Sequence, residues 1–299
     1  AKKIYEAKGR PSDNPLILHI SKREELDAIA ARIPETAEKL MDAFWPGPMT
    51  LIFEKTKAVP YETTGGLDTV AVRMPSHEGA RQLIESAGVP VAAPSANTSG
   101  RPSPTTAEHV KEDLWGRIDM IIDGGPVGIG LESTIVDFTE EVPVVLRPGY
   151  ISLEMLQEVL GDVRMDKGLI KPDSKVHPKA PGMKYKHYAP DADLKIVEGD
   201  EAKVVEYIND NVNRLISQGY KVAVMTTEEG KHNYNKGIIV SMGHKDDELS
   251  AARHLYAVLR EFDNENVDYV FSESFETDNV GRAVMNRLIK AAGHTIINV

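Results

Sequence analysis

Residues 166–193 constrain the fold more than any other part of the sequence, because prolines interrupt every regular period there. The stretch contains four prolines: Pro172, Pro178, Pro181 and Pro190. Each proline fixes φ and lacks a backbone N–H, so this spacing favours an extended strap over a helix or a central strand. The chain of 299 residues is long enough for two domains. We therefore expect one domain over 1–165, the strap over 166–193 and a second domain over 194–299.

The block over 194–299 alternates between short apolar runs and amphipathic segments. Val204, Ile208, Val212 and Leu215 recur at helical spacing, so they share one face of a predicted helix. The expected strands are 194–197, 222–225, 237–241 and 269–272. Further helices are expected over 249–262 and 280–292. This alternation predicts a small open parallel sheet with helices on both faces, which is a Rossmann-like α/β domain.

The block over 1–165 mixes helices and strands in a less regular order. Expected strands are 15–20, 49–54, 69–74, 89–93 and 118–122, and the runs 133–138 and 142–146 are expected to pair as a hairpin. Expected helices are 34–45, 77–87 and one capped by Ser21, with Glu24 at the capping-box position. The pattern predicts an α/β domain with a twisted mixed sheet.

Charge and composition narrow the function classes. The formal net charge is −11, from 46 acidic and 35 basic residues, so the surface repels nucleic acid and stable binding to it is not expected. The absence of cysteine excludes disulfides, thiolate catalysis and cysteine metal sites. No apolar run is long enough for a membrane span, and residues 1–6 are not a signal peptide, so we expect a cytoplasmic protein. Because residues 2–8 have the pattern of a helix end, we also expect the natural N-terminus to lie further upstream.

Three cations are candidates for binding anions. Lys8 and Arg10 flank a glycine in a loop that directs both at one target, with Asn14 close behind and His19 one strand away. The alternative for this group is a solvated basic surface. Arg73 lies inside an otherwise apolar, alternating strand, where a buried cation is costly unless it is paired. It forms either a structural ion pair or a clamp for a carboxylate or a phosphate.

Hydroxyl-rich segments supply two further candidates. Residues 94–102 follow a predicted strand, and their serine and asparagine side chains suit phosphate or ribose oxygens. An ordinary turn is the alternative, and a nucleophilic serine would lack the usual G-x-S-x-G elbow. Residues 132–134 and Arg147 either contact a ligand or belong to the surface. The nine histidines show no metal-ligand spacing, and no phosphate-binding P-loop motif occurs.

Taken together, these groups resemble the motif order of the YrdC-like family. The order is Lys-Gly-Arg-Pro from residue 8, Thr-Val-Ala-Val-Arg-Met-Pro from 69, Ala-Pro-Ser-Ala-Asn-Thr-Ser-Gly from 93, Glu-Ser-Thr-Ile-Val-Asp from 132 and Leu-Arg-Pro-Gly from 146. The strap over 180–190 is similar to the linker of the family's two-domain branch, the L-threonylcarbamoyladenylate synthases. Residues 280–288 are similar to that branch's C-terminal domain, so the resemblance covers nearly the whole chain.

The resemblance implies a nucleotidyltransferase reaction. L-threonine, bicarbonate and ATP, the last bound with Mg²⁺, would give threonylcarbamoyl-AMP and pyrophosphate. The product would pass to the tRNA threonylcarbamoyl-transfer machinery, which makes N6-threonylcarbamoyladenosine. The first domain would be a twisted α/β fold with a concave, positive cleft. No protein metal site and no membrane partner are expected.

The resemblance also implies a role for each matching residue. Lys8 and Arg10 would be catalytic. The ATP-binding set would be Lys8, Arg10, Asn14, Thr69, Ser95, Asn97, Ser103, Arg147, Tyr185, His187 and Tyr188. The L-threonine-binding set would be His19, Arg73, Ala93 and Ser133, with Arg73 on the substrate carboxylate.

One departure and two alternatives accompany this interpretation. Nothing before Lys8 matches the family's N-terminal Pro-Thr-(Asp/Glu)-Thr-x-Tyr-Gly-Leu type motif, which supplies a further threonine-binding hydroxyl. A positive concave face would also suit an RNA-binding module, although the acidic net charge argues against it. Carbamoyl transfer from carbamoyl phosphate is the other alternative, but the related larger proteins carry zinc-finger segments that a cysteine-free chain lacks.

Overall fold

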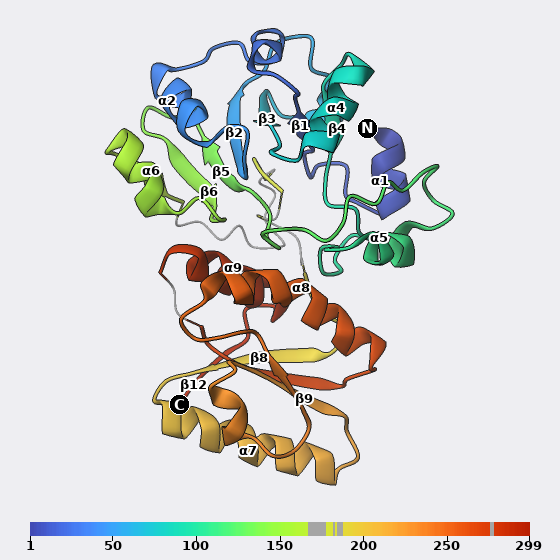
Figure 1. The fold of residues 1–299 in the computed structure, drawn as a ribbon, viewed down its shortest axis with the longest axis vertical. Helices are drawn as coiled ribbons and strands as arrows, with labels where there is room; N and C mark the ends of the chain where they lie inside the picture. Colours follow the sequence, from blue (N-terminus) through green and yellow to red (C-terminus); the bar gives the residue numbers. More distant parts are fainter. Residues whose placement is uncertain (167–177, 182, 184–187, 276–277) are drawn as a thin grey trace. The chain divides into compact units, whose positions relative to one another are not determined.

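The computed structural model describes residues 1–166, 178–181, 183, 188–275 and 278–299. The chain forms two compact units, both drawn in Figure 1. The first unit contains 1–99, 111–124 and 132–185, and the second contains 100–110, 125–131 and 186–299. Among the described residues, no helix is both long and apolar enough to cross a membrane.

The first unit is built on a seven-stranded sheet with the order β4-β1-β3-β2-β5-β6-β7. Its strands are β1 (Ile17–His19), β2 (Met49–Glu54), β3 (Thr69–Arg73), β4 (Val91–Ala93), β5 (Thr134–Asp137), β6 (Val144–Arg147) and β7 (Arg164–Met165). β2 runs antiparallel to β3 and parallel to β5. The sheet is therefore mixed, which confirms the predicted fold class, and β5 and β6 pair antiparallel as the predicted hairpin.

Helices cover one face of this sheet. Leu51, Val72 and Val136 point to this covered face and pack into a core with α2 (Glu35–Phe44) and α6 (Leu153–Leu160). Figure 1 shows these two helices side by side. Each fully buried aliphatic side chain in such a core contributes roughly 1.5–3 kcal/mol to stability. This core fixes the strands whose ends carry the polar residues described below.

The opposite face of the sheet carries a smaller core. Ile17, Ile52, Ala71 and Ile135 point to this side and form a second cluster with Ala180. These residues alternate with those of the covered face, as the period of two in a strand requires. The candidate site lies on this second side, which is called the site face below.

The remaining helices of this part are short, and some differ from expectation. They are α1 (Lys2–Lys8), η1 (Arg23–Ala28), α3 (Tyr61–Thr64), α4 (Glu78–Ala87) and α5 (Ala107–Leu114). The helix predicted after Ser21 is wrong in type and cap. It is a 3-10 helix that begins after Lys22, and the Ser21 hydroxyl bonds the Glu25 carboxylate instead of the backbone.

The strand predicted over 118–122 is also wrong. Ile118, Met120 and Ile122 alternate as in a strand, but they are exposed and pair with no other strand among the described residues. The sequence alternates there as a strand would, but no neighbouring strand among the described residues pairs with its backbone. The helices α5 and α6 were not predicted.

The second unit contains a five-stranded parallel sheet with the order β10-β9-β11-β8-β12. Its elements are β8 (Asp193–Glu198), α7 (Glu201–Ser217), β9 (Val222–Thr226), η2 (Gly230–Asn233), β10 (Ile238–Ser241), α8 (Glu248–Asn264), β11 (Tyr269–Glu273), α9 (Asn279–Ala291) and β12 (Ile296–Asn298). Figure 1 shows α7 on one face and α8 with α9 on the other. The predicted Rossmann-like arrangement is confirmed.

Candidate active site

Five neighbouring strands of the first sheet place residues in one transverse row. His19 at the end of β1 is paired with Arg73 at the end of β3, and Arg73 is paired with Thr50 in β2. Thr50 is paired with Ile135 of β5, which is paired with Arg147 at the end of β6. Side chains in register on adjacent strands point to the same face. The row therefore brings three predicted ligand-binding residues, His19, Arg73 and Arg147, to the site face.

Arg147 reaches the site face because of a β-bulge. Ile135 pairs with Arg147, but the next residue, Val136, pairs with Val145, so Leu146 is an extra residue in β6. Val136 and Val145 pack in the core of the covered face. Strict alternation from Val145 would return Arg147 to that core. The extra residue turns Arg147 to the other side, which is a common use of bulges beside functional sites.

Arg147 is held by the backbone and the side chain of Ser133. It is only 3% exposed, and its Nε and Nη2 donate to the Ser133 carbonyl at 3.0 and 2.9 Å. Its Nη2 also lies 3.1 Å from Ser133 Oγ, which in turn bonds Thr50 Oγ1 at 2.7 Å. This network orients a cation and two hydroxyls before any ligand arrives.

Arg73 is a largely desolvated cation with few hydrogen bonds of its own within the described part of the chain. Its Nε donates to the Gly47 carbonyl at 3.1 Å, and among the described residues it has no carboxylate partner. Burial, together with the nearby charge of Arg147, lowers the pKa of Arg73 to about 10. The structural ion pair considered for Arg73 is therefore not seen among the described residues. Two mutually repelling, desolvated guanidinium groups favour a bound carboxylate or phosphate.

His19 lies beside Arg73 and is neutral at physiological pH. Burial, and then the charge of Arg73, lowers its pKa to about 4, although backbone hydrogen bonds oppose the shift. Its Nδ1 lies 3.2 Å from the Ile17 carbonyl. A neutral imidazole keeps one nitrogen as an acceptor. His19 is therefore suited to accept a hydrogen bond from a hydroxyl or an amine.

Lys8 connects the helix α1 to the loop after β4. Its Nζ donates to the Ser95 carbonyl at 2.5 Å, to Asn97 Oδ1 at 3.0 Å and to the Asn97 carbonyl. The backbone N–H of Ser99 donates to the Lys8 carbonyl at 2.8 Å, and Ser95 Oγ donates to Asn97 Oδ1 at 2.6 Å. The structure thus brings together the predicted residues Lys8, Ser95 and Asn97.

Lys8 and Arg10 form a second pair of buried cations. Burial, and then the charge of Arg10, lowers the pKa of Lys8 to about 7, while Asp113 opposes the shift. Arg10 donates to the carbonyls of Asn14 and Pro15 at 3.1 and 2.8 Å, which fixes the turn before β1. The basic loop is therefore not a solvated surface. An anion bound here would restore the usual preference of Lys8 for its charged form.

The side chain of Asn14 is buried without satisfying its hydrogen bonds. Its exposed fraction is 1%, and neither its Nδ2 nor its Oδ1 has a hydrogen-bond partner among the residues that the structure describes. Native proteins leave few buried polar groups in this state, so each one calls for a reason. A ligand that brings hydrogen-bond donors and acceptors to the Arg10 loop would satisfy both side-chain atoms of Asn14.

Thr69 and Ala93 lie at the opposite end of the site face from the row. Thr69 begins β3 and precedes Arg73 by four residues, which corresponds to about 13 Å along a strand. Ala93 pairs with Ile17, two residues before His19. Both share this end with the turn that Arg10 fixes. The predicted ATP residues Lys8, Asn14 and Thr69 therefore lie toward the start of β1, and the predicted threonine residues His19 and Arg73 toward its end.

Two residues of this region were missed in the sequence. Thr50 bonds Ser133, but its position inside an apolar strand gave no signal of a polar role. Asp113 accepts from the backbone N–H of Thr98 at 2.9 Å, which holds the Ser95–Ser99 loop. It lies on α5, a helix that was not predicted, so no sequence pattern linked it to the loop.

The remaining predicted ATP residues lie elsewhere. Ser103 and Tyr188 belong to the second unit, where both are buried. There, Arg260 of α8 donates to the Pro102 carbonyl at 2.7 Å, and Tyr188 packs on Tyr256 with ring centroids 5.2 Å apart. Tyr185 and His187 lie outside the described residues. For these four, a role in ATP binding stays a prediction.

No group of three or more His, Asp or Glu side chains that could hold a metal ion occurs within the described ranges. A Mg²⁺ ion delivered with ATP needs no such group, because phosphate oxygens and water supply most of its ligands. The cations Lys8 and Arg10 fit a phosphate chain that carries such an ion.

Two family models match consecutive parts of the chain. Residues 1–149 match the Sua5/YciO/YrdC family, whose description is "Telomere recombination". Residues 151–293 match the family described as "Threonylcarbamoyl-AMP synthase, C-terminal domain". The second match accounts for the parallel-sheet part of the chain.

Relatives match along almost the entire chain. The threonylcarbamoyl-AMP synthase of Pyrococcus abyssi is 49% identical over 298 residues, covering 100% of this chain and 86% of the relative. That of Bacillus subtilis is 49% identical over 297 residues, covering 99% of this chain and 84% of the relative. That of Schizosaccharomyces pombe is 37% identical and covers 97% of this chain and 79% of the relative.

A solved structure has the same fold. The crystal structure of P. abyssi Sua5 complexed with L-threonine superposes with a TM-score of 0.92 at 48% identity, covering 100% of this chain and 86% of that chain. Sequence models, relatives and fold agree, so this chain belongs to the two-domain Sua5 branch of the YrdC-like family, the threonylcarbamoyl-AMP synthases.

Proposed function

We propose that this chain synthesises threonylcarbamoyl-AMP from L-threonine, bicarbonate and ATP, with release of pyrophosphate. The observation that carries the proposal is the row on the site face. Arg73 is desolvated without a carboxylate partner among the described residues, and Arg147 lies in the same row. A desolvated cation such as Arg73 favours an anionic ligand, and Arg147 adds a second positive charge to the row. Membership of the synthase family identifies that ligand as an anionic substrate of the synthase reaction.

L-threonine would bind at the row. Arg73 would pair with its carboxylate, and the neutral His19 would accept from its hydroxyl or its amine. Ser133 would contribute a fixed hydroxyl, because Thr50 and Arg147 already hold it. Ala93, further along the face, would leave space for the ligand. The L-threonine bound to the P. abyssi relative supports this choice of substrate.

ATP would lie toward the start of β1. Lys8 and Arg10 would neutralise phosphate charge, and Asn14 would satisfy its side-chain amide on the nucleotide. Ser95 and Asn97 would contribute through the loop that Lys8 organises. Lys8 and Arg10 would hold the phosphate chain with which Mg²⁺ is delivered, and the ion would supply further charge neutralisation.

The reaction needs no protein nucleophile. The threonine amine would form a bond to the carbon of bicarbonate with loss of water, giving a carbamate. A carbamate oxygen would then form a bond to the α-phosphorus of ATP as the bond to the pyrophosphate oxygen breaks. Two anions that repel each other in water must be held together for this step. Orientation of reactants can supply roughly 7–11 kcal/mol of such a barrier, and fixed cations lower it further.

The product would pass to the tRNA threonylcarbamoyl-transfer machinery, and we propose a cytoplasmic location for the protein beside that machinery. Mixed anhydrides of this kind hydrolyse in water. A short transfer to the next enzyme would therefore protect the product.

Pyrophosphate release from ATP tests the proposal. We expect release only when L-threonine and bicarbonate are both present, and loss of release in Arg73→Leu. Arg23→Leu is the matched control, because Arg23 pairs with Asp42 on the surface. Release that continues without threonine, or that survives Arg73→Leu unchanged, would overturn it. If the protein releases no pyrophosphate but binds RNA in a salt-dependent way, and Arg73→Leu does not change that binding, the RNA-binding module is favoured instead.

A further inference from the structure

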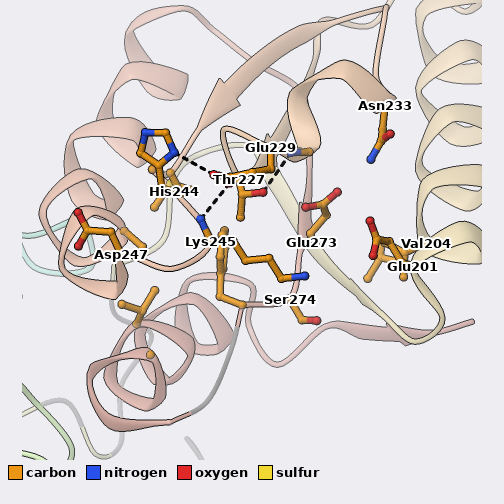
Figure 2. Close-up of a pocket in the computed structure, with 18 of the residues that line it drawn as sticks. Glu201, Val204, Thr227, Glu229, Asn233, His244, Lys245, Asp247, Glu273 and Ser274 are labelled. Carbon is orange, nitrogen blue, oxygen red and sulfur yellow. Dashed lines mark hydrogen bonds and ion pairs between the residues drawn. The ribbon is translucent and has the colours of Figure 1, made fainter.

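The second unit contains a cavity whose lining includes none of the residues assigned above to the synthase reaction. Its volume is about 490 Å³, within the range of small-molecule sites, and it is drawn in Figure 2. Its walls come from the segments that follow β8, β9, β10 and β11. All four strands are parallel, so their carboxyl ends meet at one edge of the sheet. This edge is where open α/β sheets bind ligands.

One wall presents carboxylates. Glu273, at the end of the central strand β11, accepts from Tyr234 Oη at 2.6 Å and from Thr226 Oγ1 at 2.7 Å. These two bonds fix the carboxylate and leave each oxygen able to accept again. Glu201, in the first turn of α7, is exposed and lines the same cavity. Figure 2 shows both side chains on the same side of the cavity.

The opposite wall presents a cation on a fixed loop. Glu229 Oε2 accepts from the Lys245 backbone N–H at 2.9 Å, and Glu229 Oε1 lies 2.8 Å from His244 Nδ1. These contacts hold the loop after β10. The Lys245 side chain then extends across the cavity toward Glu273 and Ser274 in Figure 2. Its ammonium group forms no ion pair with any residue in the described ranges.

The charges define the chemistry of the ligand. A triphosphate would face Glu201, Glu229 and Glu273 with a single lysine, so repulsion disfavours it. A molecule with one ammonium and one carboxylate matches the carboxylates of Glu201 and Glu273 on one wall and the Lys245 ammonium on the other, where the Glu229 carboxylate is already bonded to His244 and to the loop backbone. Val204 and Val284 also line the cavity, and their apolar side chains suit a small organic side chain.

We propose that this cavity binds a free L-α-amino acid as its zwitterion. The ligand ammonium contacts Glu201 and Glu273, and the ligand carboxylate contacts Lys245 and the Ser274 hydroxyl. This site is separate from the row on the first sheet, and it does not depend on the proposed synthase activity. The second unit would therefore bind its own ligand.

The test uses the full chain carrying Arg73→Leu, so that threonine binding at the first sheet does not contribute. Each standard L-α-amino acid is titrated by calorimetry and by thermal shift. We expect at least one to bind, and its binding to weaken by about ten- to a hundredfold in Lys245→Met and in Glu201→Gln, the loss of a charged hydrogen bond. Lys236→Met and Glu206→Gln, which remove exposed charges outside the cavity, should leave binding unchanged.

Ligand analogues test separately whether the ammonium and the carboxylate of the amino acid are needed for binding. The corresponding amine without a carboxylate and the N-acetyl amino acid should each lose binding, because each leaves one wall unmatched. Methyl NMR signals of Val204 and Met242 should shift with the amino acid, which reports occupancy of the cavity directly. The proposal is overturned if no amino acid binds, if binding ignores both cavity variants, or if adenosine shifts these methyl signals and amino acids do not.

Discussion

The pKa of Lys8 makes the affinity for ATP depend on pH in a direction that can be worked out. Burial and Arg10 hold the pKa of Lys8 at about 7 in the free protein. A bound triphosphate favours the charged ammonium, so the pKa of Lys8 in the complex rises toward its ordinary value near 10.5. Well below pH 7 the lysine is almost fully charged, and its charge no longer changes the affinity. Above pH 7 each binding event must first protonate Lys8, so affinity falls as the pH rises.

The size of the effect follows from the fraction of Lys8 that is charged. That fraction is about one half at pH 7 and about one hundredth at pH 9, so ATP should bind roughly fiftyfold more weakly at pH 9. This corresponds to about 2.3 kcal/mol. Calorimetry with Mg²⁺-ATP, in the absence of threonine and bicarbonate, measures the affinity. Repeating it at pH 8 in buffers of different ionisation enthalpy should show uptake of about 0.9 proton per ATP.

Two variants separate Lys8 from the titration of ATP itself. Lys8→Gln cannot titrate, so its weakened affinity should change little between pH 7 and pH 9. Lys3→Gln removes an exposed lysine from the same helix and should retain the full wild-type dependence. Affinity of the wild type that stays constant from pH 7 to pH 9, or a slope that persists in Lys8→Gln, would refute the assignment of Lys8 to the phosphate site.

Other predictions concern the remaining site residues. Arg73→Lys keeps the charge but not the planar donor pair, so the KM for threonine should rise by about tenfold while ATP affinity stays unchanged; an equal loss of both would contradict the separate placement of the two substrates. Asn14→Leu removes a buried amide that has no hydrogen-bond partner within the described part of the chain, so the free protein should gain up to about 1–3 kcal/mol of unfolding free energy while ATP affinity falls. A loss of stability in denaturant titrations would show that Asn14 has a structural role instead. His19 has a folded pKa of about 4, below its unfolded value of 6.5, so its contribution to stability is complete above pH 6.5 and is lost as the pH falls toward 4. Because His19 is not fully buried, the free energy of unfolding should fall by about 2–3 kcal/mol over this pH range. His19→Gln should abolish that part of the pH dependence. Gly149→Ala would place a Cβ 2.6 Å from the backbone nitrogen of Thr134, so activity and melting temperature should both fall.

Segments with strong periodicity were predictable from the sequence. The helix α7 was placed correctly because apolar spacing identifies its buried face, and the strand β2 (Met49–Glu54) because it is a short, mostly apolar run that is buried on both faces. The stretch over 118–122 shows the limit of this signal. Its alternation is as regular as that of a strand, but a strand also needs a partner for its backbone, and no spacing within five residues contains that information.

The candidate site depends on pairings that are distant in sequence. Motif resemblance identified Arg73 and Ser133, but neither residue's own surroundings indicate that Thr50 lies between them in the sheet. The same holds for Asp113, which fixes the Ser95–Ser99 loop from a helix fifteen residues away. Sequence patterns report which faces are apolar, whereas the order β4-β1-β3-β2-β5 decides which polar residues meet.

The bulge in β6 shows how strongly a site can depend on one residue of register. Val145 and Leu146 point to opposite faces, and the inserted residue lets Arg147 share the site face with Ile135. Alternation read from the sequence would place Arg147 in the core of the covered face, where a guanidinium would be buried among Val136 and Val145 at a high cost. The bulge avoids that cost, because it turns the Arg147 guanidinium to the site face, where it donates to the Ser133 carbonyl. The fold therefore positions this cation by breaking the regular strand period, whereas His19, Arg73 and Thr50 reach the same face through regular pairing.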